Sequence, residues 1–228
     1  MEKNQYELCL EVLRRLDRTG VLKYVILIGS WCLPFYREYF SSTRYSPSIR
    51  TRDVDFLVVS PKDIRVHVDV PTLLKDMGFV VRHHGAQGYM KLEHPDLMVE
   101  FLSPEKGRGM DEPVNIPKLG VNAQALRYLN FLVTDIMTVH TQGLSLRMPH
   151  PVYFALHKLI VSQNRPKKEK AEKDKEAAVM LLRVLIRKGD TALIRSIFDA
   201  TLPAWQKTIL KGLQDLEDRD ILKVLVER

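Results

Sequence analysis

Two aspartates stand at the start of an apolar run and are separated by a single residue. Asp53 and Asp55 lead directly into Phe56–Val59, a segment with the composition of a buried strand. Because alternate residues of a strand point to the same face, we expect both carboxylates to project side by side. Two such carboxylates repel each other, and a bound cation removes that cost. Mg²⁺ suits this chemistry, because it binds one or two protein carboxylates together with substrate phosphates.

A third acid, Glu100, interrupts the apolar segment Leu97–Leu102. An acid in an apolar strand is costly unless a charge or a metal compensates it. One interpretation is a glutamate at an exposed edge, or one paired with an arginine such as Arg52. The other places Glu100 on a strand beside Asp55, where it completes a triad of carboxylates. Three carboxylates and a polyphosphate can hold two Mg²⁺ ions for in-line phosphoryl transfer.

A small turn precedes these acids in the chain. The apolar run Tyr24–Ile28 predicts a buried strand, and it ends in Gly29-Ser30. We predict a helix from Ser30 to about Phe40. A short turn between a strand and a helix offers backbone N–H groups to a phosphate. The segment 24–60 therefore combines a predicted phosphate site with a predicted metal site.

The remaining hydrophobic pattern predicts a sheet with flanking helices in the first two thirds of the chain. Short connections between the strands predicted over 79–102 favour antiparallel neighbours. We predict helices over 3–18 and 71–77, strands over 54–59, 79–83, 88–93 and 96–102, a loop over 103–120, a helical turn over 123–128 and a hairpin over 132–148.

The segment Met148-Pro149-His150-Pro151 is the predicted domain boundary, because the pattern after it is entirely helical. We predict helices over 151–163, 167–188, 191–198, 203–213 and 218–226. The expected fold is therefore α+β, with a mixed sheet flanked by helices in residues 1–148 and a helical bundle in residues 149–228. The charge run Lys167–Lys175 has two interpretations: a phosphate-binding segment, or a solvated helix face with pairs such as Glu169–Lys173.

Composition limits the class of protein. The 228 residues are 45% hydrophobic and 28% charged, as in ordinary globular proteins. The sequence has no apolar run long enough to span a bilayer, and its first residues do not resemble a secretory signal. Two cysteines without metal-ligand spacing indicate reduced thiols. We therefore expect a cytoplasmic protein without a membrane partner.

The net charge of +7 is concentrated in the C-terminal third. Residues 151–228 carry 16 Lys and Arg against 11 Asp and Glu. Such an excess favours a polyanionic partner, either a nucleotide or an RNA. A nucleic-acid-binding regulator that uses the C-terminal helices is disfavoured. The predicted helix 191–198 after the Gly189-Asp190 turn is mostly apolar, so it lacks the base-reading side chains of a recognition helix.

Taken together, these motifs resemble a known superfamily. Gly29-Ser30, then Asp53-x-Asp55 within the string Arg50-Thr51-Arg52-Asp53-Val54-Asp55-Phe56, then an acid on a later strand, are similar to the polymerase-β-type nucleotidyltransferases. The likeness is to their small prokaryotic branches, which include toxin-type and uncharacterised members, and it covers about residues 20–190. The third acid is Glu100 where aspartate is more usual in the family.

The resemblance implies roles for individual residues. Gly29 and Ser30 would hold the β- and γ-phosphates of a nucleoside triphosphate (NTP). Asp53, Asp55 and Glu100 would be the catalytic acids and the ligands of Mg²⁺ or Mn²⁺. Candidates for further nucleotide contacts are Lys158, Lys173 and Asp174, with Asp174 orienting one of the lysines.

Two functions follow from the resemblance. The first is an Mg²⁺-dependent nucleotidyltransferase that transfers a nucleoside monophosphate (NMP) from an NTP to an acceptor hydroxyl on a tRNA, a protein or a small molecule. The second is a non-catalytic module of the same fold that binds a nucleotide or a partner, for example within a toxin–antitoxin system.

Overall fold

The computed structural model describes residues 2–47, 51–105, 112–214 and 218–226. Arg50 and residues 106–111 of the predicted loop lie outside these ranges. The chain forms two compact units. The sheet unit comprises residues 1–38, 47–130 and 136–148, and the helical unit comprises residues 39–46, 131–135 and 149–228.

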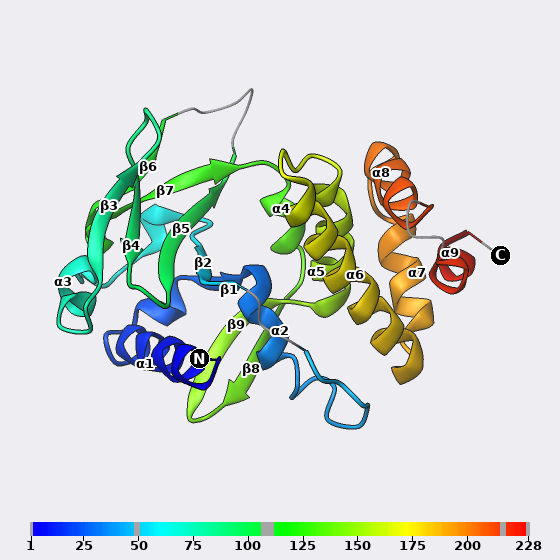
Figure 1. The fold of residues 1–228 in the computed structure, drawn as a ribbon, viewed down its shortest axis with the longest axis horizontal. Coiled ribbons are helices and arrows are strands. Elements are labelled where there is room, and N and C mark those ends of the chain that lie inside the picture. The colour runs from blue at the N-terminus through cyan, green and yellow to red at the C-terminus, as the bar shows by residue number, and fades with distance from the viewer. Residues whose placement is uncertain (1, 48–50, 106–111, 215–217, 227–228) are drawn as a thin grey trace. The chain divides into compact units, whose positions relative to one another are not determined.

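A seven-stranded mixed sheet is the centre of the sheet unit (Figure 1). Its central strand is β5, which is parallel to β2 on one edge. On the other edge β5 pairs with antiparallel β4 over Met98–Glu100 and with parallel β7 over Phe101–Pro104. The strands are β1 (Ile26–Ile28), β2 (Asp53–Leu57), β3 (Val80–His84), β4 (Tyr89–Glu93), β5 (Met98–Pro104), β6 (Val114–Ile116) and β7 (Val121–Leu126).

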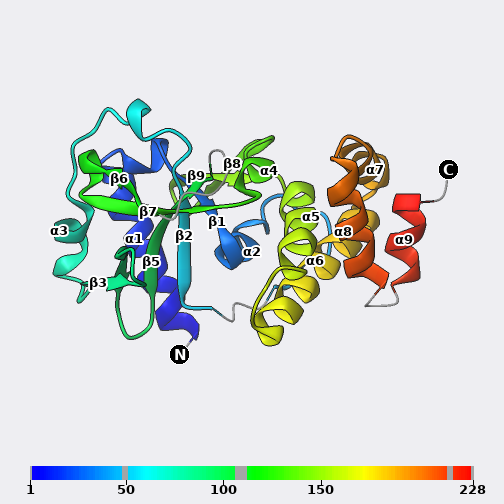
Figure 2. The same ribbon diagram turned by 90° about the horizontal axis from the view of Figure 1, so that it is seen from above.

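Outer strands complete this sheet and a smaller one. β1 pairs antiparallel with β2, β3 with β4, and β6 with β7. The antiparallel order predicted for residues 79–102 is confirmed. A separate hairpin joins β8 (Ile136–Thr141) to β9 (Leu144–Pro149), as the sequence predicts. Figure 2 shows the strands from above.

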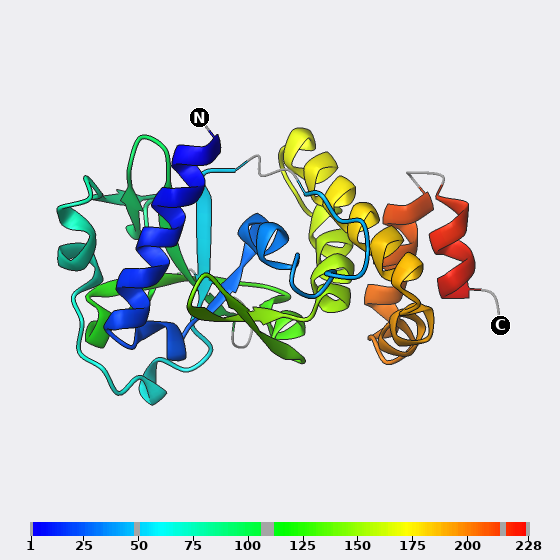
Figure 3. The same cartoon turned by 90° about the horizontal axis from the view of Figure 1, so that it is seen from below.

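One face of β2 and β5 forms the core of the sheet unit. Val54 and Phe56 alternate with the two aspartates and are fully buried, and the rings of Phe56 and Phe101 lie 5.7 Å apart. Helix α1 (Glu2–Arg18), which runs alongside the sheet in Figure 3, buries one stripe of apolar side chains. Burial of this apolar area is the main favourable term in folding.

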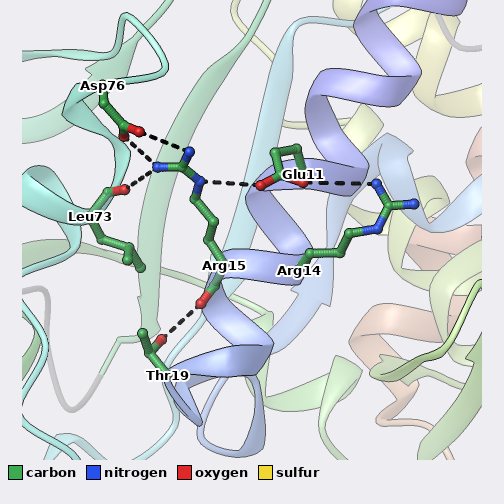
Figure 4. A network of polar contacts seen from close by, with 6 residues as sticks. All are labelled: Glu11, Arg14, Arg15, Thr19, Leu73 and Asp76. Carbon is green, nitrogen blue, oxygen red and sulfur yellow. Dashed lines mark hydrogen bonds and ion pairs between the residues drawn. The ribbon is translucent and has the colours of Figure 1, made fainter.

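A bidentate ion pair fastens α1 to α3 (Val70–Lys75), as Figure 4 shows. The guanidinium of Arg15 donates to both carboxylate oxygens of Asp76 and, at 2.9 Å, to the carbonyl oxygen of Leu73. Its Nε also donates to Glu11 on the same helix at 3.3 Å. Such a planar fork fixes the orientation of both partners. On β2, Asp53 and Asp55 alternate with buried Val54 and Phe56, so the aspartates lie on the opposite face of the strand from these two core residues.

Helices make up the helical unit, and α5 is central to it. Nearly every side chain of α5 is buried, and His150 caps its N-terminus by accepting from the Val152 N–H at 3.3 Å. The helices are α5 (Pro151–Ser162), α6 (Lys168–Lys188), α7 (Thr191–Asp199), α8 (Pro203–Gln214) and α9 (Arg219–Val226), labelled in Figure 1. The predicted α+β class with C-terminal helices is therefore confirmed.

Tyr39 belongs to the helical unit although it is distant from those helices in sequence. Its hydroxyl donates to Asp190 at 2.9 Å, and His150 Nε2 lies 3.1 Å from the same oxygen. The Lys188 ammonium lies over its ring, 4.4 Å from the centroid. Tyr39, the first residue of the segment 39–46, is thus held by contacts with the α6–α7 junction and with the residue that caps α5.

Three local predictions are wrong. Within the loop predicted over 103–120, Val114–Ile116 is strand β6 and Pro117–Leu119 is a 3₁₀ turn. Residues 123–128 do not form a helical turn, because Val121–Leu126 is strand β7. The helix predicted over 30–40 is reduced to a 3₁₀ turn, Gly29–Trp31, and a four-residue helix α2, Cys32–Phe35. The short helix α4 (Leu129–Leu132) follows β7 instead. No helix in the described part of the chain is both long and apolar enough to cross a membrane.

Candidate active site

Strand β2 presents the two aspartates on its open face. Asp53 and Asp55 are partly exposed, whereas Val54 and Phe56 between and after them are buried. The strand alternation predicted from the sequence therefore puts both carboxylates on the face away from the core.

The parallel register of β2 and β5 brings the third acid alongside. Asp55 is paired with Glu100, so their side chains leave the same face of adjacent strands. Glu100 is 15% exposed at its side chain, in keeping with a site that solvent reaches only in part. The interpretation that placed Glu100 beside Asp55 is correct in register.

The Gly29-Ser30 turn lies directly against Asp55. β1 pairs Ile28 with Asp55, and the chain turns immediately afterwards at Gly29 with φ +70°. A Cβ atom on Gly29 would lie 2.1 Å from Asp55 Oδ2. Only glycine therefore allows both this backbone conformation and this close approach of the carboxylate.

The helix behind this turn is short. Because α2 has only four residues, its dipole adds little to anion binding. A phosphate at Gly29 and Ser30 would depend on individual backbone N–H groups and on the Ser30 hydroxyl. The predicted phosphate role of this turn stays a prediction.

A lysine on β4 neutralises Glu100. The antiparallel register pairs Lys91 with Glu100, and Lys91 Nζ lies 2.7 Å from Glu100 Oε2. Burial lowers the pKa of Lys91, but the bond to Glu100 and the charges of Glu100, Asp53 and Asp55 outweigh it, so the net pKa is raised.

Sequence reasoning missed Lys91 and considered Arg52 as the partner of Glu100. The structure places Arg52 elsewhere, since its guanidinium donates to the carbonyl oxygen of His94 at 2.7 Å. The signal that could have found Lys91 is the hairpin register. Glu93 pairs with Met98 across the turn, so two residues further from the turn on each strand Lys91 lies opposite Glu100.

The fit of this site to a divalent cation is partial. Within the described ranges, no three His, Cys, Asp or Glu side chains are close enough together to hold a metal ion. Asp53 and Asp55 on one face of β2 match the pair of carboxylates that Mg²⁺ uses alongside phosphates. The carboxylate of Glu100, in contrast, is engaged by Lys91.

A second group of predicted residues lies in the helical unit. Lys158 on α5 and Asp174 on α6 are buried, and Lys158 Nζ lies 2.5 Å from Asp174 Oδ1. Arg165 Nε binds the other carboxylate oxygen at 2.7 Å. Burial raises the pKa of Asp174, but the two cations outweigh it, so the net pKa is lowered. The structure thus brings Lys158 and Asp174 together, and their predicted nucleotide contacts stay predictions.

Lys173 has a different environment. It lies on the exposed side of α6 and pairs with Glu169 at 2.7 Å. This is the i,i+4 pair of the solvated-face interpretation. Its predicted phosphate contact stays a prediction.

His157, which precedes Lys158, was not among the predicted site residues. The ring is buried, and its Nε2 has no hydrogen-bond partner among the described residues. Burial, followed by the charge of Lys158, lowers its pKa to about 3. His157 is therefore neutral at physiological pH.

Comparison with known proteins gives one matching family model and several similar solved structures. A family model described as nucleotidyltransferase matches residues 7–201. The solution structure of the antibiotic-resistance factor ANT(2'')-Ia is 10% identical over 97% of this chain and 100% of that chain, with a TM-score of 0.49.

Two other solved structures have similar scores. An antigenic nucleotidyltransferase-like protein from Paracoccidioides brasiliensis is 13% identical over 96% of this chain and 91% of that chain, with a TM-score of 0.47. ANT(2'')-Ia in complex with adenylyl-2''-tobramycin is 11% identical over 86% of this chain and 98% of that chain, with a TM-score of 0.46. No curated protein matches the chain.

Proposed function

The chain belongs to the nucleotidyltransferase family, and from this premise we propose that it is an enzyme dependent on Mg²⁺ or Mn²⁺. It transfers NMP from an NTP to an acceptor hydroxyl. The acceptor is a tRNA, a protein or a small molecule. The basic excess of residues 151–228 favours the tRNA or protein acceptor slightly over the small molecule.

The observation that carries the proposal is the contact between the turn and the acid. Gly29 adopts a left-handed conformation, and the carboxylate of Asp55 occupies the place of its missing Cβ. This turn needs both a positive φ and the absence of a side chain. Such a strained backbone conformation costs free energy, and a turn that only connected a strand to a helix would not require it. A phosphate held at the turn would sit next to a carboxylate-bound cation.

Each residue then has a defined task. Gly29 and Ser30 bind the β- and γ-phosphates through backbone and hydroxyl donors. Asp53 and Asp55 hold the cation, which when bound supplies charge neutralisation on the phosphates. Glu100 accepts the proton of the acceptor hydroxyl as its oxygen attacks the α-phosphorus and pyrophosphate leaves. In-line transfer of this kind depends mainly on positioning and electrostatic stabilisation.

The non-catalytic alternative is favoured by one observation. Glu100 is already neutralised by Lys91 at 2.7 Å, so the third acid is not poised as a free carboxylate. A module of this fold that only bound a nucleotide or a partner would tolerate that pairing without further change.

Transfer of label from α-³²P NTPs separates the two functions. The protein is incubated with each NTP, Mg²⁺ or Mn²⁺, and either total RNA or cell lysate. We expect labelled product with the wild type and a loss of about 10²-fold or more in Asp53→Ala and in Asp55→Ala. The matched control is Asp63→Ala, which removes an exposed aspartate of the same unit.

Unchanged labelling in both site variants would refute the assignment of the aspartates. A wild type that labels no acceptor, yet unfolds at a higher temperature in the presence of an NTP, would support the binding module.

A further inference from the structure

Four charged residues form a row across four neighbouring strands. The pairings Asp55 with Glu100, Glu100 with Lys91, and Lys91 with Arg82 follow from the registers of β2, β5, β4 and β3. Paired residues of adjacent strands share a face, so all four side chains leave the same side of the sheet. The row is negative at Asp55 and Glu100 and positive at Lys91 and Arg82.

Lys91 is set into this row rather than free at its end. Its side chain is 21% exposed and that of Glu100 is 15% exposed, and their charged atoms lie 2.7 Å apart. Ion pairs with this degree of burial are screened less than surface pairs. Lys91 therefore supplies Glu100 with a positive charge that is part of the protein itself.

We propose that Lys91 is the resting counter-ion of Glu100 and competes with a divalent cation for that carboxylate. In the nucleotide-free protein a divalent ion then has Asp53 and Asp55 as its protein ligands, and it gains Glu100 only when Lys91 is displaced. Lys91 is thus a positioning residue that keeps the third acid out of the metal site. The inference rests on the proposed function, which assigns Asp53 and Asp55 as the residues that hold the cation. It adds Glu100, which the family resemblance implies as a third ligand.

The magnitude follows from the charge that Lys91 carries. One positive charge about 6 Å from a divalent ion, in a water-like dielectric, weakens binding roughly tenfold. Arg82 lies one strand further from the ion than Lys91, which adds about 5 Å to the distance. At that distance salt screening reduces its effect on the affinity for the ion to less than about threefold. Lys91 and Arg82 are therefore a matched pair that differs in distance along the same row.

The test is a titration of the nucleotide-free protein with Mn²⁺, in which the electron paramagnetic resonance signal reports the concentration of free Mn²⁺. We expect Lys91→Met to bind Mn²⁺ about tenfold more tightly than the wild type or better. Arg82→Met should change affinity less than about threefold, and Lys91→Arg should stay close to the wild type because it keeps the cation. Thermal unfolding of each variant checks that the fold is retained.

A double-mutant cycle separates the release of a ligand from a general charge effect. Glu100→Gln should weaken Mn²⁺ binding in both backgrounds, and the fold-loss should be at least about ten times larger in the Lys91→Met background than in the wild type. The reason is that Glu100 is a metal ligand only when Lys91 is removed. Equal costs in the two backgrounds, or unchanged Mn²⁺ affinity in Lys91→Met, would overturn the inference. Absence of Mn²⁺ binding in both wild type and Lys91→Met would overturn it as well.

The proposed function fails in a different way. Its failure is the absence of label transfer with NTP and metal both present, whatever the Mn²⁺ affinity of the nucleotide-free protein.

Discussion

Substitution of Gly29 by alanine tests the geometry that joins the turn to the acid. Alanine adds one methyl group, and two separate costs arise from it. The first is the backbone conformation, since φ is +70° at this residue. The second is the contact with Asp55 Oδ2, which would be 2.1 Å from the new Cβ.

These costs can be separated with a second glycine. Gly88, in the turn between β3 and β4, also has φ +70°, but an added Cβ would meet nothing within 4 Å. We expect Gly88→Ala to lose about 1 kcal/mol in the free energy of unfolding, the cost of a left-handed non-glycine residue. Gly29→Ala has the same backbone cost, and the carboxylate of Asp55 must also move by at least about 1.3 Å, from 2.1 Å to an ordinary contact of 3.4 Å or more.

A shift of that size matters far more for chemistry than for stability. Misplacement of a reacting group by about 1 Å costs roughly 10²-fold in rate. Label transfer should therefore fall about 10²-fold in Gly29→Ala and stay near wild type in Gly88→Ala. The free energy of unfolding is measured by urea denaturation of all three proteins. Equal activity losses in the two variants would refute the argument from the Asp55 contact.

Three further outcomes concern the helical unit. His157 has a pKa of about 3 in the folded protein and about 6.5 in the unfolded protein, so the folded state loses stability as the pH falls below about 6.5. Between pH 7 and pH 5, the free energy of unfolding measured by urea denaturation should therefore decrease by about 2 kcal/mol less in His157→Gln than in the wild type. An equal decrease in the two proteins would contradict the burial of the ring. Asp174→Asn should destabilise the protein by about 3 kcal/mol or more in the same assay, because it leaves Lys158 buried without its anion, and a loss below about 1 kcal/mol would contradict the buried pairing. Lys173→Met should leave the thermal midpoint unchanged, since its pair with Glu169 is exposed, and a clear shift would indicate another contact.

Much of the acidic site follows from strand periodicity. Alternation alone predicts that Asp53 and Asp55 share a face, and an acid within Leu97–Leu102 needs a compensating charge wherever the strand lies. The identity of that charge does not follow from alternation. It depends on the register between β4 and β5, which a one-residue slip would reverse. Lys91 was therefore beyond reach of a pattern argument that did not first fix the hairpin.

The wrong prediction at β7 shows tertiary pairing deciding the structure of a segment. Val121, Ala123 and Ala125 are buried and alternate with partly exposed Asn122 and Gln124, so the period of two was present in the sequence. Alanine favours helices, but pairing with β5 and β6 decides the structure of this segment. Propensity is a weak guide where tertiary pairing competes with it.

Because Tyr39 belongs to the helical unit, the two units cannot be separated into independent fragments, or exchanged by recombination, with one cut in the chain. The chain passes between the two units five times, after residues 38, 46, 130, 135 and 148. A fragment ending at residue 148 keeps Tyr39 but loses His150 and Asp190, the partners of its hydroxyl. A fragment beginning at residue 149 has the reverse defect. A single crossover between genes at this boundary would therefore not exchange one intact unit for another, and the two units are expected to be inherited together.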